Sequence, residues 1–160
     1  MYSTSTFVDM LVSIGFKTEG YILTKEYPDG NRMSVDIEHR KLTFPSAIKG
    51  RERNDFYDDK HKENMVVFEC VERLLTKGYH PEHIELEKEW HLGHDTKGGR
   101  ADICITDPEG QMLIIIECKT YGEEYEDEMA NMLNDGGQLF SYWQQEKATR
   151  WLCLYASPYQ

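Results

Sequence analysis

The fold of this chain is decided by one segment, Gly99-Arg-Ala-Asp-Ile-Cys-Ile-Thr-Asp-Pro-Glu-Gly-Gln-Met-Leu-Ile-Ile-Ile-Glu-Cys-Lys-Thr120. Residues 101–106 and 112–119 are both β-favouring runs, and the second is rich in isoleucine. Between them, residues 107–110 are Asp-Pro-Glu-Gly, which places Asp, Pro and Gly where a type I turn favours them. The segment is therefore predicted to form a β-hairpin closed by residues 107 and 110.

The predicted hairpin gathers charged side chains on one face. With that closure, Asp102 lies opposite Ile115 and diagonal to Glu117. Because alternate residues of a strand share a face, Asp102, Glu117 and Lys119 project to the same side. By the same rule Cys118 points the other way, into the core. Two carboxylates and one ammonium are thus expected to converge at the end of an apolar hairpin.

Two neighbouring carboxylates repel each other unless a positive charge lies between them, and an unpaired charge on such a surface is costly. A divalent cation bound by Asp102 and Glu117 resolves this conflict. Because both groups are hard oxygen donors, we expect Mg²⁺, with Mn²⁺ as a substitute. Lys119 then suits an attacking water or the charge that develops on a phosphate. The alternative is a surface strand that carries a Glu-Lys pair, which is a common arrangement.

The spacing of these charged residues resembles a known nuclease motif. Asp102, fourteen intervening residues and then Glu117-Cys118-Lys119 resemble the PD-(D/E)XK motif. Over about residues 63–157, the chain is similar to the N-terminal nuclease domain of type I restriction enzymes. In that group the domain belongs to an R subunit or is fused to an adenine methylase.

The resemblance extends to a second signature, because Gln138 and Tyr142 form the Q-x-x-x-Y pattern of that branch. One departure is that Ala101, and not proline, precedes the first acid. Residues four apart share a helix face, so an amide and a phenol there can hydrogen-bond the phosphate backbone or orient Lys119. The alternative for Tyr142 is a core position in a helix that packs through its aromatic residues.

The resemblance implies a fold, a reaction and a set of ligands. The implied fold is an α/β restriction-endonuclease-like sandwich, with a mixed central β-sheet flanked by helices. The implied reaction is Mg²⁺-dependent hydrolysis of DNA phosphodiester bonds by an endonuclease of a restriction-modification system. Asp102 and Glu117 would hold the metal, with the backbone carbonyl of Cys118 and the carboxylate of Glu63 completing its shell. Arg100 either touches a DNA phosphate or is only the surface end of its strand.

The best helical pattern covers residues 62–77 and carries two candidate acids. Glu63 falls on the apolar arc, whereas Glu69 lies with Glu72 and Arg73 on the side predicted to be solvated. The apolar arc comprises Val67, Cys70, Val71, Leu74 and Leu75. On pattern alone, Glu63 is equally well explained as an N-terminal acid favoured by the helix dipole. The resemblance implies a metal-assisting glutamate on this helix and favours Glu63 over Glu69.

The remaining pattern divides the chain into two parts. Residues 1–56 are predicted to form a small α/β appendage, and residues 57–160 the nuclease core. The appendage has a helix over 4–14 and strands over 21–26, 32–37 and 41–44. The core adds a strand over 84–90, a Gly-rich turn over 94–99, helices over 124–133 and 138–147, and a strand over 150–156. Because the chain stops just after that last strand, we expect a fragment of a longer polypeptide.

Composition limits the class of protein and its compartment. With 160 residues, 39% of them hydrophobic and 29% charged, the chain fits one soluble globular domain. No stretch approaches the length of a membrane span, and residues 1–6 lack the features of a signal peptide. The four cysteines have no CxxC spacing, so they are expected to be reduced, mostly buried thiols of a cytoplasmic protein.

The net charge of −11 weighs against a free-standing DNA binder, because neutralising phosphates requires a basic surface. We therefore expect double-stranded DNA to be bound together with further domains or subunits of a restriction-modification complex. The acidic segment 121–128 would repel DNA and should face away from the substrate or be ordered by a partner. Two alternatives remain, a non-catalytic nuclease-like module that binds DNA or docks subunits, and a metal-dependent enzyme that acts on another substrate such as RNA.

Overall fold

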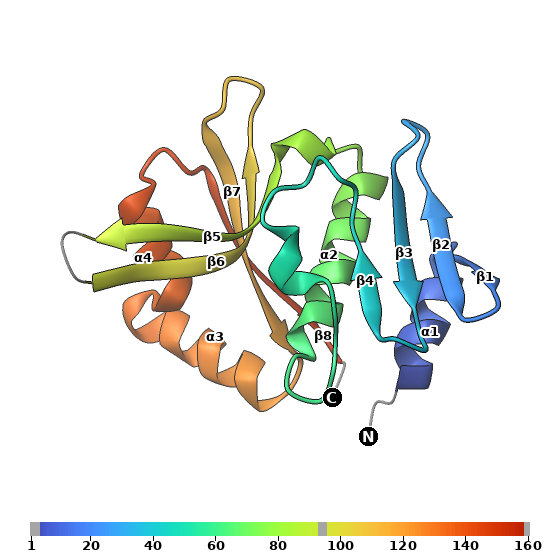
Figure 1. Ribbon diagram of the computed structural model, residues 1–160. Coiled ribbons are helices and arrows are strands. Elements are labelled where there is room, and N and C mark those ends of the chain that lie inside the picture. The colour runs from blue at the N-terminus through green and yellow to red at the C-terminus, as the bar shows by residue number, and fades with distance from the viewer. Residues whose placement is uncertain (1–3, 93–95, 159–160) are drawn as a thin grey trace.

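The computed structural model describes residues 4–92 and 96–158, which form two four-stranded β-sheets and four α-helices (Figure 1). The first sheet is antiparallel and contains β1 (Lys17–Glu19), β2 (Ile22–Glu26), β3 (Arg32–Asp36) and β4 (Lys41–Thr43), in that order. The second contains β5 (Ile84–Leu92), β6 (Thr96–Thr106), β7 (Met112–Thr120) and β8 (Trp151–Ser157), also in that order. It is mixed, because β8 runs parallel to β7 while the other pairs are antiparallel.

Helices cover both faces of the second sheet. Helix α2 (Glu63–Thr76) lies between the two sheets, and α1 (Thr4–Ser13) packs against the first (Figure 1). Helices α3 (Glu123–Asp135) and α4 (Gly137–Gln145) lie on the opposite face of the second sheet. Short 3-10 turns at Arg51–Asn54 and Pro81–His83 lead into and out of the α2 region. The α/β class predicted from the sequence is therefore correct.

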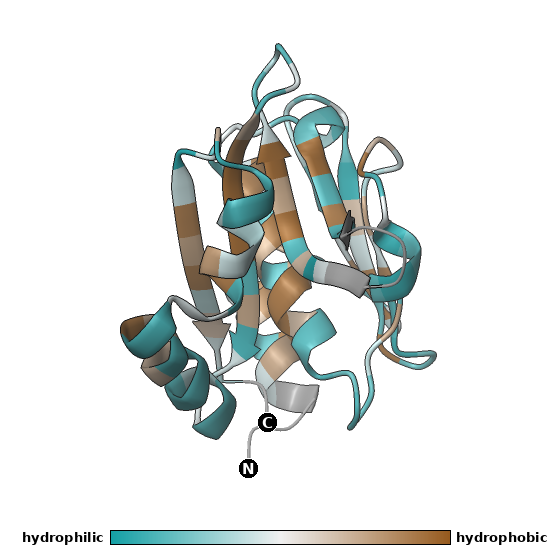
Figure 2. Ribbon diagram, turned by 90° about the vertical axis from the view of Figure 1, so that its left-hand side faces the viewer, coloured by the Kyte–Doolittle hydropathy of each residue, from teal (hydrophilic) through white to brown (hydrophobic). Residues whose placement is uncertain are grey.

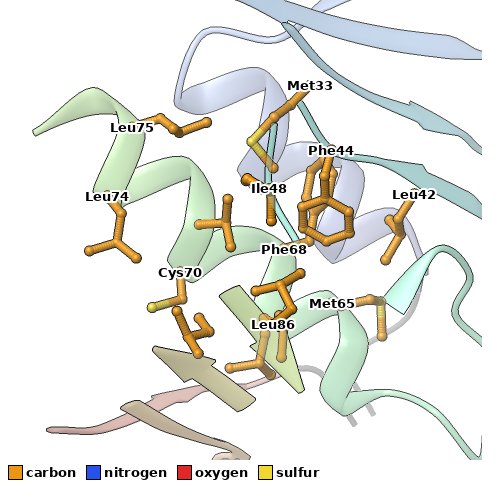
Figure 3. Packing of buried hydrophobic residues seen from close by; sticks show 14 of the residues in the cluster. Met33, Leu42, Phe44, Ile48, Met65, Phe68, Cys70, Leu74, Leu75 and Leu86 are labelled. Carbon is orange, nitrogen blue, oxygen red and sulfur yellow. The ribbon is translucent and has the colours of Figure 1, made fainter. Parts of the chain in front are cut away.

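The alternation of side chains along β6 and β7 divides the core between the two faces. Ile103 and Ile116 belong to the buried cluster around α2, which takes residues from both sheets and centres on Phe68 (Figure 3). Cys104 and Ile115 point the other way and pack with residues of α4. Hydrophobic residues accordingly gather along the central strands, while loops are mostly hydrophilic (Figure 2). Each strand thus contributes to two cores.

The turn of the central hairpin is one residue longer than predicted. Gly110 N donates to Asp107 O at 2.9 Å, as in a type I turn, but Gly110 itself has a φ of +83°. Asp107 N then bonds Gln111 O, so the closing pair is 107 with 111. A type I turn followed by a left-handed glycine is a common three-residue hairpin connection. A second irregularity between Ile105 and Thr106 shifts the register by one more residue.

The predicted pairing of Asp102 with Ile115 is therefore wrong. The observed pair is Ile103 with Ile116, and continuing this register places Asp102 directly opposite Glu117. The total shift is two residues, and because side chains alternate with a period of two, every residue keeps its predicted face. Asp102, Glu117 and Lys119 consequently still project from the same face of the sheet, as predicted.

Two acids of α2 are buried, although the sequence predicts them on a solvated side. Glu69 accepts hydrogen bonds from Arg73 and from the hydroxyl of Ser157, and Glu72 is paired with Lys25 of β2. The helical wheel assumed one covered face, but α2 lies between two sheets and is covered on both sides. Arg73 extends outward and stays about half exposed, as predicted.

The other predicted boundaries of helices and strands lie close to the observed ones, with two exceptions. Strand β1 was missed, because its three residues are all exposed and show no apolar alternation. The Gly-rich turn predicted over residues 94–99 is strand from Thr96 onward, and residues 94 and 95 lie outside the described part of the chain.

The four cysteines are free thiols, as predicted. Cys70, Cys104 and Cys118 are buried, and Cys153 is partly buried. Among the described residues, no helix has both the length and the apolar character that crossing a membrane requires.

The ion pair between Lys25 and Glu72 should be important for stability. Glu72 is 2% exposed, and Lys25 also donates to Ile14 O at 2.7 Å, which connects β2 and the residue after α1 to α2. Lys25→Ala leaves a buried carboxylate without its cation and should lower the free energy of unfolding by about 3 kcal/mol. The matched control is Arg32→Ala, which removes an exposed pair with Glu26 and should cost about 0.5 kcal/mol or less. Urea denaturation measures both, and equal losses would contradict the role assigned to the buried pair.

Candidate active site

Charged residues of β6, β7 and α2 meet in a pocket of about 400 Å³ on the α4 side of the second sheet. The pocket lining includes all seven side chains that the sequence predicts for the site: Glu63, Arg100, Asp102, Glu117, Lys119, Gln138 and Tyr142. Cys118, whose predicted contribution is its backbone carbonyl, lies between two of them on β7 with its thiol fully buried on the other face. Residues separated by up to 79 positions in the sequence are thus brought together.

Asp102 lies one residue beyond the last backbone pair between β6 and β7 and is only 8% exposed. Its Oδ2 accepts the main-chain N–H of Cys118 at 2.6 Å, so the carboxylate bridges β6 to β7 beyond the last backbone pair. Burial raises the pKa of Asp102 well above its usual range, and the charges of Glu117 and Glu63 raise it further. The carboxylate is therefore held in place but poorly solvated.

Glu117 is the most buried acid of the pocket, at 3% exposed. Its Oε1 accepts a hydrogen bond from Lys119 Nζ at 2.7 Å, while its Oε2 is buried and has no hydrogen-bond partner among the described residues. Burial raises the pKa of Glu117 from 4.5 to about 7, against the opposing effect of Lys119. An unsatisfied buried carboxylate oxygen is unusual in a folded protein, and this one is free to accept a cation or a hydrogen-bond donor.

Lys119 places its ammonium between two acids. Its Nζ donates to Glu117 Oε1 and, at 3.1 Å, to Glu63 Oε1. Burial by itself would lower the pKa of Lys119, but the charges of Glu117, Glu63 and Asp102 more than offset this and raise it. Lys119 is therefore a fixed cation that stays protonated at neutral pH.

Of the two acids considered on α2, the structure brings Glu63 to the pocket and leaves Glu69 outside it. Glu63 is the first residue of the helix, and burial raises the pKa of its carboxyl. Glu69 is engaged with Arg73 and Ser157 on another side of the helix. The helix N-terminus also favours a negative charge at Glu63.

Gln138 and Tyr142 share the face of α4 that borders the pocket. With its amide nitrogen turned toward the carboxylates, Gln138 Nε2 lies 3.0 Å from Glu117 Oε1. The Tyr142 hydroxyl donates to Arg100 O at 2.7 Å, and its ring stacks on Trp90 with centroids 5.4 Å apart. Tyr142 is only 2% exposed, so it is both a core residue, as the packing alternative states, and part of the pocket wall.

Residues 62–149, more than half of the chain, match the family model described as the Type I restriction enzyme R protein N terminus. The chain belongs to this family. The match begins one residue before α2 and ends before β8, so it contains all seven side chains that the sequence predicts for the site. No curated protein matches the chain. Membership in the R-protein N-terminal family places the chain in a restriction-modification context.

In this R-protein N-terminal domain, two further residues that the sequence did not single out contact side chains of the pocket wall. Glu128 of α3 is buried, and its Oε1 accepts the N–H of Gln138 at 3.0 Å. A side chain at Gly99 would place its Cβ 2.2 Å from the ring of Tyr142, so only glycine allows this close packing. The Gly98-Gly99 pair within a strand was an available signal, because glycine there often marks a close approach.

The acidic segment 121–128 was predicted either to face away from the substrate or to be ordered by a partner, and the first of these alternatives is wrong. Glu123, Glu124 and Asp127 line an adjoining pocket of about 660 Å³ that also contains Glu63 and Lys119. The reason is the short connection, since α3 starts three residues after the end of β7. The first turn of α3 is thereby kept beside the site.

The donor groups of the pocket suit a hard divalent cation. Asp102 and Glu117 offer carboxylate oxygens, one of them buried and unsatisfied, and Cys118 adds a main-chain carbonyl. In the described part of the chain, no three His, Cys, Asp or Glu side chains form a ready-made ligand set. This composition fits Mg²⁺, which is commonly held by one or two carboxylates and keeps several waters.

The raised pKa of Glu117 should make folding depend on pH in a defined direction. Because its pKa rises from 4.5 to about 7 on folding, its stabilising contribution is complete below pH 4.5 and lost as pH rises through 7. Between pH 5 and 8, wild type should therefore lose about 2 kcal/mol more unfolding free energy than Glu117→Gln. Urea denaturation at both pH values measures this, with exposed Glu109→Gln as the control that should follow wild type. Parallel pH profiles for wild type and Glu117→Gln would show that Glu117 titrates normally.

Proposed function

We propose that this chain is the Mg²⁺-dependent endonuclease domain of a type I restriction enzyme, with the restriction-endonuclease-like core and the PD-(D/E)XK site. Its substrate is the phosphodiester backbone of double-stranded DNA. The observation that carries the proposal is the meeting of Asp102, Glu117 and Lys119 in one largely buried pocket. Membership in the R-protein N-terminal family supports the restriction context of this chemistry.

The metal would be held by the oxygen donors of β6 and β7. Asp102 and Glu117 would be its carboxylate ligands, with the carbonyl of Cys118 and the carboxylate of Glu63 as further donors, and Mn²⁺ could replace Mg²⁺. When bound, such an ion lowers the pKa of water and neutralises charge on phosphoryl oxygens. Cation binding would also relieve the repulsion among the acids and satisfy the buried Oε2 of Glu117.

Lys119 supplies a fixed positive charge to the same place. Its ammonium is held by Glu117 and Glu63, so its position is set before the substrate arrives. A preorganised cation of this kind stabilises negative charge that develops on a phosphoryl oxygen or orients the attacking water. Gln138, by bonding Glu117, limits the rotation of that carboxylate and provides an amide at the pocket wall.

One alternative function is supported by a specific observation. The acids of α3 beside Glu63 and Lys119, together with the net charge of −11, oppose the approach of DNA to the isolated domain. A non-catalytic nuclease-like module that docks other subunits would tolerate these charges. If the chain is the endonuclease domain, other parts of the full-length enzyme would bind the DNA.

Lys119→Ala in the full-length enzyme separates these two functions. If Lys119 acts on charge that develops in the transition state, its loss should reduce turnover about 10²–10³-fold. DNA affinity should change far less, because the contact matters chiefly in the transition state. The measurement is nicking of plasmid DNA with Mg²⁺ at matched DNA occupancy.

The matched control for this experiment is Lys17→Ala, which removes an exposed lysine from β1, outside the pocket. This variant should nick DNA like the wild type. Equal nicking by wild type and Lys119→Ala would reject Lys119 as catalytic. A wild-type enzyme that binds DNA but does not nick it would support the docking module instead.

A further inference from the structure

One residue of β5 adopts a backbone conformation that its side chain disfavours. Glu87 has a φ of +55°, and Arg40 is the other non-glycine residue with positive φ in the described part of the chain. Arg40 lies in an exposed turn, where such angles are common, whereas Glu87 lies inside a strand. A non-glycine residue in the left-handed region is strained and persists only where surrounding contacts enforce it. Glycine would remove this strain, so the glutamate side chain at this position requires an explanation.

The strained residue lies beside the candidate site. In the β5–β6 ladder, Leu86 pairs with Ile103 and Lys88 pairs with Ala101, which leaves Glu87 opposite Asp102. Glu87 and Asp102 are missing from a register that is otherwise continuous from Ile84 to Glu89, and the register shifts between Glu89 and His91. The positive φ of Glu87 thus lies directly across from the first acid of the motif. Strained backbone is concentrated at functional sites in proteins, which makes this location informative.

The carboxylate of Glu87 has a defined partner, the guanidinium of Arg100. Glu87 Oε2 forms an ion pair with Arg100 Nε, and the Glu87 side chain is only 12% exposed. Arg100 lines the pocket, while Glu87 does not. The contact is an ion pair without hydrogen-bond geometry, because the buried Glu87 Oε2 accepts no hydrogen bond in the described part of the chain. The guanidinium carries five N–H donors in a planar fork.

Arg100 differs from Lys119, the other cation of the pocket lining. Lys119 is 16% exposed and donates to two carboxylates, whereas the Arg100 side chain is 52% exposed at the rim. A half-exposed guanidinium kept at the rim by an ion pair suits bidentate binding of a phosphate. The acids of the pocket would otherwise leave little attraction for an approaching DNA strand.

We propose that Glu87 is a positioning residue, which holds Arg100 at the rim of the pocket so that its Nη groups bind a phosphate of the DNA backbone. This inference rests on the proposed function and specifies how the same site binds its DNA substrate. The strained φ of Glu87 is the conformation that directs its carboxylate to Arg100 and not into the pocket. Glu87 thus acts through Arg100 and has no contact with the reacting atoms.

The test is Glu87→Gly in the full-length enzyme, because glycine relieves the strain and removes the carboxylate together. Affinity for a DNA duplex should fall about tenfold, as expected for loss of an oriented charged hydrogen bond, with KM rising in step and kcat changing less than about twofold. The thermal midpoint should stay the same or rise. Arg40→Gly is the matched control, since it relieves the same strain in an exposed turn and should leave DNA affinity unchanged.

Two further variants, tested alone and in combination, measure whether Glu87 and Arg100 act together in DNA binding. Arg100→Ala should weaken binding by a similar factor and lower the salt dependence by about one ion, and the double variant should be no weaker than Arg100→Ala. Glu87→Gln keeps the size of the side chain but removes its charge, so it should weaken binding about as much as Glu87→Gly. Unchanged affinity in Glu87→Gly, additive losses in the double variant, or a lowered thermal midpoint would each overturn the proposal. These experiments measure DNA binding and not cleavage. A wild-type enzyme that fails to nick DNA would therefore count against the proposed function and not against the role of Glu87 and Arg100.

Discussion

The hydrogen bond from the main-chain N–H of Cys118 to the carboxylate of Asp102 is the contact on which the candidate site depends. It connects β6 to β7 at 2.6 Å, just past the last backbone pair, Ile103 with Ile116. By fixing Asp102 next to residue 118, it also fixes the acid beside Glu117 and Lys119. The carboxylate is therefore a structural bridge and a candidate ligand at once.

This arrangement places charge where burial disfavours it. The pKa values of Asp102, Glu117 and Glu63 are all raised, chiefly by burial, so the folded chain bears the cost of desolvated acids. Lys119 compensates for only part of this charge. A protein that retains such strain commonly does so for function, and a divalent cation is the partner that would relieve it. The same acids explain why this R-protein N-terminal domain has an acidic and not a basic pocket.

Local patterns in the sequence predict the site better than they predict the details of the fold. The faces of Asp102, Glu117 and Lys119 follow from strand alternation alone, which is unaffected by a register shift of two. The register itself was wrong, because the glycine bulge at Gly110 and the irregularity before Thr106 leave no clear local signal. A hairpin turn sets register, but the sequence motif does not distinguish a two-residue from a three-residue loop.

Features that depend on distant segments were not predictable. Glu69 is buried beside β8 and Glu72 beside β2, which belong to different sheets, and a helical wheel includes neither neighbour. Glu128 reaches Gln138 and the adjoining pocket only because α3 folds back beside β7. The positive φ of Glu87 depends on the β5–β6 pairing, and a glutamate gives no local indication of it. Long-range packing decides each of these cases.

The central claim is that the carboxylates of β6 and β7 form a divalent-cation site, and calorimetric titration of the chain with Mn²⁺ tests it most directly. Wild type should bind Mn²⁺ and release protons near pH 7, because the pKa of Glu117 is raised to about 7 and metal ligands must be deprotonated. Asp102→Asn and Glu117→Gln should each abolish the binding, while exposed Glu109→Gln should leave it intact. Mn²⁺ binding that persists in both site variants, or no binding by wild type, would contradict the account.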